Sequence, residues 1–430
     1  MRLKIAACWL LLALMVLPAR AQSLPRGDAA AEKISIAKLD AFTTVLRDMV
    51  DRKQIGGASA LVARNGKVVY FAAVGLADSD GAKLVAEDTI FRIASMTKPI
   101  TSVTAMTLVE EGKLNVGDPV SKYLPEFKQA VVITDAKSGA TRAAAREITI
   151  HDLLTQTSGI TYRFMSKPGV GPLYLKSNVQ DGLSESPISL GENCRKIAGI
   201  PLLNDPGAAW EYGLNTDVLG RVIEVASGQT LSEAFEKRVL KPLKMEDTFF
   251  VVPEAKRSRL SAVFMPDLQK GSIAKVGIEP VVSGPLVWTT TYSTKESGYF
   301  SGGAGLCSTA GDYARFLQML LNGGELDGVR VLKKESVDEM LKNQIGDLKV
   351  GFGMHGDKFG YGFGIMSEKA DRKDGDPAPV GTFSWGSFYH SYFWGDPKNK
   401  VIAVLNTQTW PSGHLKSREE FKKAVYEAVE

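Results

Sequence analysis

Two stretches near opposite ends of the chain alternate between apolar and polar residues, which is the pattern of half-buried β-strands. The first covers residues 58–71 and is interrupted by Asn65-Gly66, a dipeptide that favours a tight hairpin turn. The second covers residues 391–407 and is interrupted at 396–399, where Asp, Pro, Lys and Asn follow one another. We therefore predict one β-hairpin near each end of the chain.

Between these hairpins, apolar residues recur at the three- and four-residue spacing of helices. The helical segments end at glycines such as Gly112 and Gly228, which are common directly after a helix. A final amphipathic segment predicts a C-terminal helix. The predicted helices cover residues 100–111, 216–226, 231–239, 312–321 and about 417–429.

This order of elements predicts an α+β fold in which strands from both termini form one antiparallel sheet flanked by helices, with a mostly helical inserted subdomain. The sheet subdomain would comprise about residues 35–90 and 293–430, and the helical subdomain about residues 91–292, within a single domain over residues 22–430. We expect a cleft at the seam, because ligand sites form where such parts meet.

The first 21 residues have the pattern of a secretory signal. Arg2 and Lys4 precede an apolar run over residues 5–17, and Ala19-Arg20-Ala21 offers the small residues of a cleavage site. The run is shorter than the roughly 20 apolar residues that span a bilayer. We therefore predict that residues 1–21 are removed, that no stable membrane anchor remains, and that the protein is periplasmic or secreted.

Removing this segment changes the charge of the chain. The full sequence has 52 basic and 48 acidic residues, a formal net charge of +4. Because Arg2, Lys4 and Arg20 belong to the predicted signal, the mature chain is close to neutral. Nucleic acid is therefore excluded as the expected partner, since it is bound by strongly basic surfaces.

The cysteines and histidines predict neither a metal site nor a cofactor site. Cys194 and Cys307 remain after cleavage, and an oxidising compartment would permit a disulfide between them. Cys307, however, follows the small and apolar run at residues 303–306, so we predict a buried thiol. The four histidines show no zinc-ligand spacing.

The strongest chemical signal is Ser95-Met96-Thr97-Lys98, followed by Pro99 and the apolar helix. A helix that begins here would place Ser95 and Lys98 on one face of its first turn. A lysine amine that is neutral for part of the time can take the proton of a serine and make it a nucleophile. The spacing alone is common, and an ordinary exposed helix start is the alternative.

Two further segments carry candidate chemistry. Tyr212 lies just before a predicted helix, in a turn with Gly213, where its phenol is either a base and proton shuttle or a packed aromatic group. The segment 381–388 opens the second hairpin, and its strand edge can donate a backbone N–H to a developing oxyanion. His390, close to that segment, is expected either in the cleft or at the surface. Candidate walls of an acyl pocket are Tyr162, Phe164, Tyr174, Trp288 and Tyr292.

These three segments, in this order, resemble the penicillin-recognising serine hydrolases of the class C β-lactamase type, and within them the family VIII carboxylesterases. Residues 91–94, 153–159, 302–309 and 361–364 are similar to further segments of that family, and the resemblance extends over about residues 35–409. It implies a β-lactamase/transpeptidase-like fold.

The resemblance also implies roles for individual residues. Ser95 would be the acylated nucleophile, Lys98 its activating base, and Tyr212 the group that shuttles protons to the leaving group and from water. The oxyanion hole would be the backbone N–H groups of Ser95 and Phe388. Which of Lys98 and Tyr212 is the resting base stays open at this point. The substrate-binding residues would be Trp385, Gly386 and Ser387.

Two departures from the β-lactamase pattern indicate the substrate class. Leu214 stands where β-lactamases have the Asn of Tyr-x-Asn, and Asn215 follows one position later. Trp385 stands where they have the lysine of Lys-Thr-Gly, so the cation that would pair with a penicillin carboxylate is missing. We therefore expect short, apolar acyl esters as substrates. The alternatives are a β-lactamase or D-amino-acid peptidase, and a weakly active penicillin-binding or scaffold protein.

Overall fold

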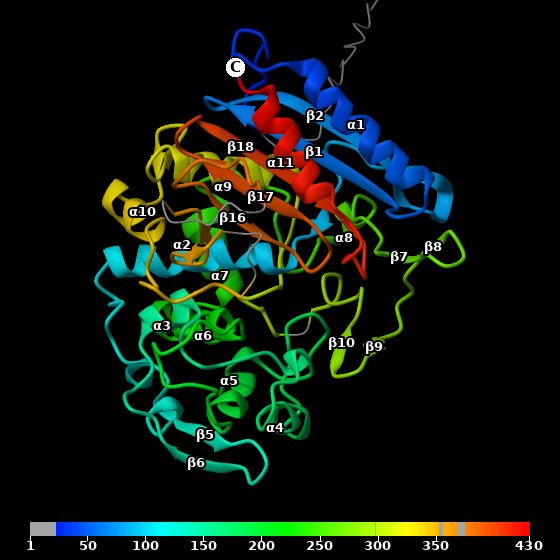
Figure 1. The fold of residues 1–430 in the computed structure, drawn as a ribbon. Helices are drawn as coiled ribbons and strands as arrows, with labels where there is room; N and C mark the ends of the chain where they lie inside the picture. Colours follow the sequence, from blue (N-terminus) through cyan, green and yellow to red (C-terminus); the bar gives the residue numbers. More distant parts are fainter. Residues whose placement is uncertain (1–22, 297, 352–355, 368–374) are drawn as a thin grey trace, which may run out of the picture.

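An eight-stranded antiparallel sheet dominates the computed structural model, which describes residues 23–296, 298–351, 356–367 and 375–430 (Figure 1). The strand order is β14-β15-β16-β17-β18-β1-β2-β3. The predicted signal over residues 1–21 lies outside the described residues. The strands are β1 Gly57–Arg64, β2 Lys67–Asp78, β3 Lys83–Leu84, β14 Lys358–Phe359, β15 Gly364–Ile365, β16 Phe383–Gly386, β17 Tyr392–Asp396 and β18 Val401–Thr407.

Both predicted hairpins are present, and they join at the centre of the sheet. β1 and β2 turn at Asn65 and Gly66, both of which have positive φ angles, as a tight hairpin turn requires. β17 and β18 form the second hairpin. β1 pairs with β18, with Ala60 opposite Leu405, so strands from the two ends of the chain are direct neighbours. The predicted fold class is confirmed.

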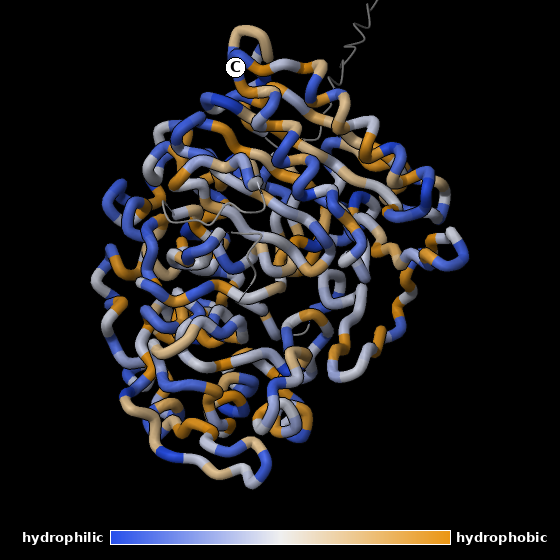
Figure 2. The backbone as a smooth tube through the Cα atoms, in the orientation of Figure 1, coloured by the Kyte–Doolittle hydropathy of each residue, from blue (hydrophilic) through white to orange (hydrophobic). Residues whose placement is uncertain are grey.

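Helices cover the two faces of this sheet. α1 (Ile36–Asp51) and α11 (Ser417–Ala428) lie side by side on one face, where the rings of Phe42 and Phe421 stack at 4.7 Å. Figure 2 shows hydrophobic and hydrophilic residues alternating along α1, as expected of a helix with one buried face. α9 (Ala310–Leu321) packs on the other face, against β1, β17 and β18.

The helical half of the molecule surrounds α2 (Thr97–Glu110), which is buried almost all round. α2 begins three residues before the predicted start at residue 100, because Pro99 is tolerated in the first turn of a helix. The predicted helix at 231–239 is shorter than expected, since α7 (Leu231–Phe235) continues as a π-helical turn, Glu236–Leu240. The other helices of this half are α3 Ile150–Thr155, α4 Gly171–Lys176, α5 Leu190–Ala198 and α6 Asn215–Ser227.

Several short elements were not predicted. Four small hairpins project from the two halves, and one two-residue pair precedes α2. They are β5 Val131–Asp135 with β6 Ala140–Ala143, β7 Phe264–Asp267 with β8 Ser272–Lys275, β9 Val281–Ser283 with β10 Leu286–Trp288, β12 Glu325–Leu326 with β13 Val329–Arg330, and β4 Phe91–Arg92 with β11 Cys307–Ser308, besides α8 Glu254–Arg257 and α10 Lys334–Met340.

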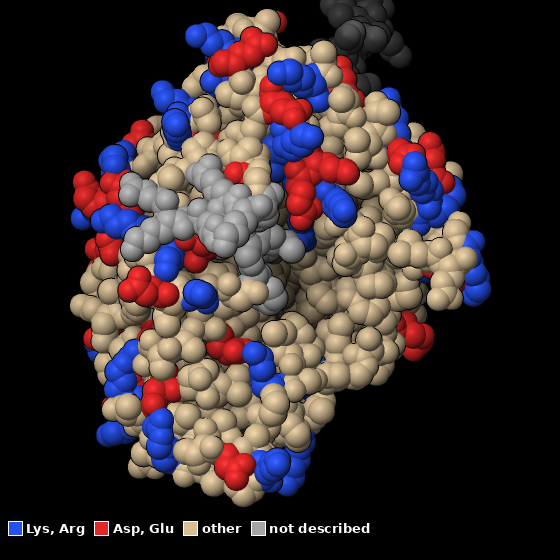
Figure 3. Space-filling model, viewed as in Figure 1, with Lys and Arg blue, Asp and Glu red and all other residues tan. Residues whose placement is uncertain are grey.

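The structure shows where the cysteines and the charged side chains of the chain lie. Cys194 and Cys307 are both free and buried, so the predicted buried thiol at Cys307 is confirmed, and burial raises its pKa to about 11. Within the described ranges, no group of His, Cys, Asp and Glu side chains is placed to hold a metal ion. None of the described helices has the length and apolar character needed to cross a membrane. Figure 3 shows basic and acidic side chains interspersed over the visible face.

Candidate active site

Ser95 lies at a strained junction between a strand and a helix. β4 pairs with β11, and a 3₁₀ turn, η2 (Ala94–Met96), then leads into α2. Ala94 has a φ angle of 41°, in the left-handed region that a residue with a Cβ occupies only at a cost of about 1–2 kcal/mol. This turn directs Ser95 toward the first turn of α2, where Lys98 lies. The Lys98 Nζ is 3.3 Å from the Ser95 Oγ.

Lys98 is completely buried and has three polar neighbours. Besides Ser95, its amine donates to the Tyr162 hydroxyl at 2.9 Å and to the Gly303 carbonyl at 2.8 Å. An ammonium group has three donors and no acceptor. The three neighbours can therefore satisfy a protonated Lys98 completely, which offsets the cost of burying its charge.

Tyr212 completes the constellation from the opposite side. Its hydroxyl is 2.7 Å from the Ser95 Oγ, and the Lys98 Nζ lies 4.6 Å from the centre of its ring. The turn that presents Tyr212 requires Gly213, because a Cβ at that position would lie 2.1 Å from the Ile160 carbonyl oxygen. The structure thus brings together the three side chains that the sequence analysis singled out, Ser95, Lys98 and Tyr212.

A buried carboxylate supports the Lys98 site from behind. Asp217, in the first turn of α6, accepts a hydrogen bond from the Tyr299 hydroxyl at 3.1 Å. Burial raises its pKa to about 6, opposed by Ser301, by the charge of Lys98, and by Tyr299 and the Gly303 backbone. A Cβ on Gly303 would lie 2.4 Å from its Oδ2, so this carboxylate packs directly on the segment whose carbonyl binds Lys98.

Sequence reasoning missed the contacts of Tyr162, Gly303 and Asp217. Tyr162 was expected only as a pocket wall, yet its ring lies 5.3 Å from that of Tyr212 and its hydroxyl contacts Lys98. An acidic residue among the apolar positions of residues 216–226 was a usable signal for Asp217. No signal exists for a backbone carbonyl such as that of Gly303.

The third segment forms β16 and the turn that follows it. Ser387 and Ser391 close this turn through a backbone hydrogen bond of 2.9 Å, and the N–H groups of Tyr389 and His390 both bond to Ser387. Among the described residues, none accepts a hydrogen bond from the Phe388 N–H. β16 runs beside η2, the turn that carries Ser95. The role of the Phe388 N–H in an oxyanion hole stays a prediction.

Trp385 is 2 % exposed and packs among aromatic rings instead of standing open to solvent. Its ring centre lies 5.6 Å from that of Tyr212, 6.4 Å from that of Trp210 and 5.3 Å from that of Phe359. The predicted contact of substrate with Trp385, Gly386 and Ser387 stays a prediction.

Two polar residues lie away from the reacting groups. The Asn215 amide is buried and bonded to Gln156 and Ser158, so the displaced asparagine is turned toward the interior. His390 was expected in the cleft or at the surface, and both expectations are wrong. It is 5 % exposed and bonds to Ser417 at 3.0 Å, and burial together with the charge of Arg418 lowers its pKa to about 2.

Comparison with known proteins places these observations in context. The family model described as β-lactamase matches residues 42–427. Esterase EstB from Burkholderia gladioli is 37% identical over 367 residues, which cover 83% of this chain and 86% of that protein. Lovastatin esterase from Penicillium rubens is 30% identical, covering 74% and 79%. The structure of "EstCE1, a hydrolase with promiscuous acyltransferase activity" superposes with a TM-score of 0.78 at 27% identity, covering 91% of this chain and 100% of that one.

Proposed function

The chain belongs to the β-lactamase family and is a serine hydrolase, and from this premise we propose that it is a carboxylesterase that cleaves short, apolar acyl esters through an acyl-enzyme on Ser95. The observation that carries the proposal is the position of the Ser95 Oγ, 2.7 Å from the Tyr212 hydroxyl and 3.3 Å from the Lys98 Nζ. Both potential proton acceptors are within reach of the nucleophile.

In the proposed acylation step, the Ser95 Oγ attacks the ester carbonyl carbon while its proton passes to Tyr212. The Tyr212 hydroxyl is the nearer of the two groups to the Ser95 Oγ, and the Lys98 Nζ, which has three hydrogen-bond neighbours, lies 4.6 Å from the centre of the Tyr212 ring. The carbonyl oxygen becomes negative and accepts the N–H groups of Ser95 and Phe388. Tyr212 then donates the proton to the leaving alcohol as the ester C–O bond breaks.

Deacylation reverses the same proton path. Water attacks the acyl carbon, its proton passes to Tyr212, and the Ser95 Oγ takes that proton back as the acid leaves. The reaction consumes one ester and one water and yields one acid and one alcohol, so no further reactant is needed. Lys98 is not part of this proton path and holds the oxygens of Ser95 and Tyr162 through its hydrogen bonds.

Three observations favour esters over lactams. The Asn215 amide is bonded inside the protein and does not offer the contact that Tyr-x-Asn provides. Trp385 occupies the place of the lysine that would pair with a carboxylate, and it is packed against Tyr212. Two of the relatives are themselves named esterases.

The test is hydrolysis of p-nitrophenyl acetate and butyrate by the wild type and by Ser95→Ala. We expect Ser95→Ala to lose activity, while Ser283→Ala, an exposed serine on β9, serves as the matched control and keeps it. Equal rates for wild type and Ser95→Ala would rule out the assignment. Faster turnover of a chromogenic cephalosporin or a D-amino amide than of these esters would instead support the β-lactamase or peptidase alternative. A stable covalent adduct without turnover would support the penicillin-binding alternative.

We also propose export, on the charged, apolar and small-residue pattern of residues 1–21. Expression of the full chain with fractionation of the cells tests this proposal. Mature protein outside the cytoplasm that begins at Gln22 is the expected result. Protein that keeps Met1 and stays in the cytoplasm would contradict it.

A further inference from the structure

We propose that Arg418, on α11, is a positioning residue that fixes the direction of the Phe388 N–H in the oxyanion hole. This inference rests on the proposed function, since an oxyanion hole has a role only if Ser95 attacks a carbonyl. It concerns a residue outside the three segments that carry the chemistry.

The guanidinium of Arg418 binds three carbonyl oxygens of one turn. Its Nη2 donates to the Ser387 carbonyl at 2.9 Å and to the Ser391 carbonyl at 3.1 Å, and its Nε donates to the His390 carbonyl at 3.3 Å. Burial lowers the pKa of Arg418 to about 10, so the group is still a cation in neutral solution. The planar, charged guanidinium thus links α11 to the turn between β16 and β17 by hydrogen bonds.

The contact with Ser387 acts directly on the proposed oxyanion donor. The carbonyl of Ser387 and the N–H of Phe388 belong to the same peptide unit, which is planar and trans, so the two groups point in opposite directions. Holding the oxygen on the α11 side therefore directs the N–H away from α11. A cation beside the oxygen also polarises the peptide and strengthens the N–H as a donor.

Other polar groups of this turn also have hydrogen-bond partners within the protein. The N–H of Phe388 is the donor that we assign to the oxyanion. The Tyr389 carbonyl accepts from Thr407 at 2.6 Å, and the His390 ring bonds to Ser417, the neighbour of Arg418. His390 has a φ angle of 68°, a conformation that a residue with a side chain adopts at a cost of about 1–3 kcal/mol. Ser417 and Arg418 together stabilise that conformation.

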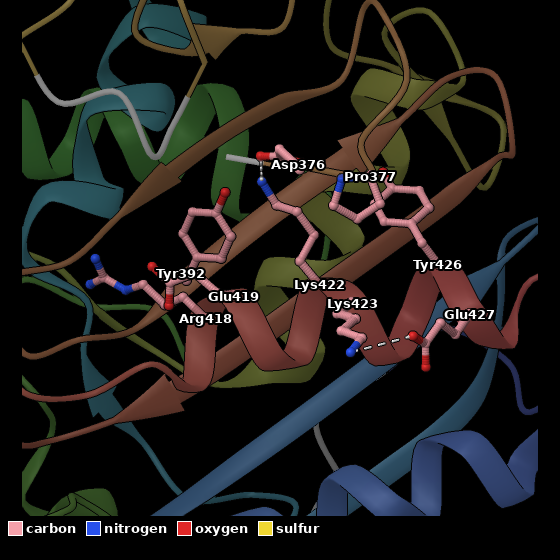
Figure 4. A pocket seen from close by; sticks show the side chains of 10 residues that line it. Asp376, Pro377, Tyr392, Arg418, Glu419, Lys422, Lys423, Tyr426 and Glu427 are labelled. Carbon is pink, nitrogen blue, oxygen red and sulfur yellow. Dashed lines mark hydrogen bonds and ion pairs between the residues drawn. The ribbon is translucent and has the colours of Figure 1, made fainter. Parts of the chain in front are cut away.

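A small cation from solution can take the place of the Arg418 side chain in a truncated variant, and this makes the inference testable. It lines a cavity of about 540 Å³ between α11, Tyr392 of β17 and residues 375–377, together with Lys422 and Asp376 (Figure 4). In Figure 4 the Lys422 ammonium points toward Asp376, and the two are 2.7 Å apart. Truncation of Arg418 would enlarge this cavity beside the three carbonyls, so a small cation has a route to them.

The experiment compares wild type, Arg418→Ala and Lys422→Met on p-nitrophenyl butyrate. We expect kcat of Arg418→Ala to fall about 100-fold with little change in KM, since loss of an aligned oxyanion donor acts on the transition state. Guanidinium chloride at low, non-denaturing concentration should restore about tenfold of that loss, whereas ethylammonium, a cation without the planar fork, should not. Lys422→Met removes another cation of the same cavity and should keep the wild-type kcat.

A second measurement separates positioning from folding. A trifluoromethyl ketone forms an oxyanion on Ser95, so its inhibition constant should rise in Arg418→Ala by about the factor lost in kcat. Arg418→Lys, which keeps the charge, should show an intermediate loss and guards against a misfolded alanine variant. The inference would be overturned if Arg418→Ala kept the wild-type kcat. It would also be overturned if guanidinium did not restore the lost kcat and Lys422→Met showed the same loss. If the wild type has no esterase activity, the proposed function fails instead.

Discussion

The Tyr212 hydroxyl lies closer to the Ser95 Oγ, at 2.7 Å, than any other side-chain group that bonds to this serine in the described part of the chain. The phenol and the serine come from segments 117 residues apart and meet over the start of α2. The short distance is the reason why the mechanism proposed above gives the proton transfer to Tyr212 and a supporting role to Lys98.

Replacing Tyr212 by Phe should remove the proton acceptor while keeping the ring packing. We expect kcat for p-nitrophenyl butyrate to fall about 10²–10⁴-fold, the usual contribution of a positioned acid or base. Steady-state kinetics measure the effect, and Tyr123→Phe is the control, because this half-buried tyrosine donates its hydroxyl to Asp118 instead of to Ser95. Activity within threefold or so of wild type would assign the base to Lys98.

Replacing Tyr162 by Phe should weaken the hold on the Lys98 ammonium without touching Ser95. The amine loses one of its three hydrogen-bond neighbours, so its position beside Ser95 is less well fixed. We expect kcat/KM for p-nitrophenyl butyrate to fall about tenfold. A kcat/KM equal to that of wild type would show that Tyr162 does not help to position Lys98.

Asp217 should make the protein less stable as pH rises. Burial raises its pKa in the folded protein to about 6, above its ordinary value of 3.8, so the unfolded chain ionises first. The free energy of unfolding should fall between about pH 4 and 6, by about 3 kcal/mol for two pKa units. Urea unfolding across this window should show a steeper fall in wild type than in Asp217→Asn, which keeps the raised pKa values of Asp181 and Asp312, with Asp51→Asn as an exposed control. Equal slopes would contradict the prediction.

Trp385 should limit the size of the acyl group through its packing beside Tyr212. Trp385→Leu leaves space among Tyr212, Trp210 and Phe359, so longer acyl chains should gain relative to butyrate. We expect the kcat/KM ratio of octanoate to butyrate to rise about tenfold, with a loss of about 1–3 kcal/mol in the free energy of unfolding. Phe42→Leu, a ring stacked on Phe421 between α1 and α11, is the control for aromatic truncation outside the pocket and should leave the ratio unchanged. An unchanged ratio would place the acyl chain elsewhere.

Local patterns in the sequence predicted the framework of this protein. The Asn65-Gly66 turn, the helical spacings and the three-residue separation of Ser95 and Lys98 all depend on neighbouring residues, whose geometry is set by the local backbone. The order of the three segments then predicted Tyr212, because a family resemblance carries long-range information. That resemblance, and the esterase side of it in particular, is confirmed by the comparisons.

The parts that sequence reasoning missed depend on contacts between distant residues. Lys98 meets Tyr162 across 64 residues and the Gly303 carbonyl across 205. Separations of this length follow from no helix or strand repeat, and a backbone carbonyl cannot be recognised from the type of residue that carries it. His390 was placed wrongly for the same reason, since its burial results from α11 lying over the turn that contains it.

The pairing of β1 with β18 has a consequence for the biogenesis of the protein. While the ribosome is still translating the last segment, β1 lacks one of its two neighbours and presents an unsatisfied backbone edge. The sheet is completed only after Thr407 has left the exit tunnel, followed by the helix that carries Arg418. A nonsense codon or a proteolytic nick in this final stretch should therefore yield insoluble or degraded polypeptide, and not a shortened enzyme with residual turnover.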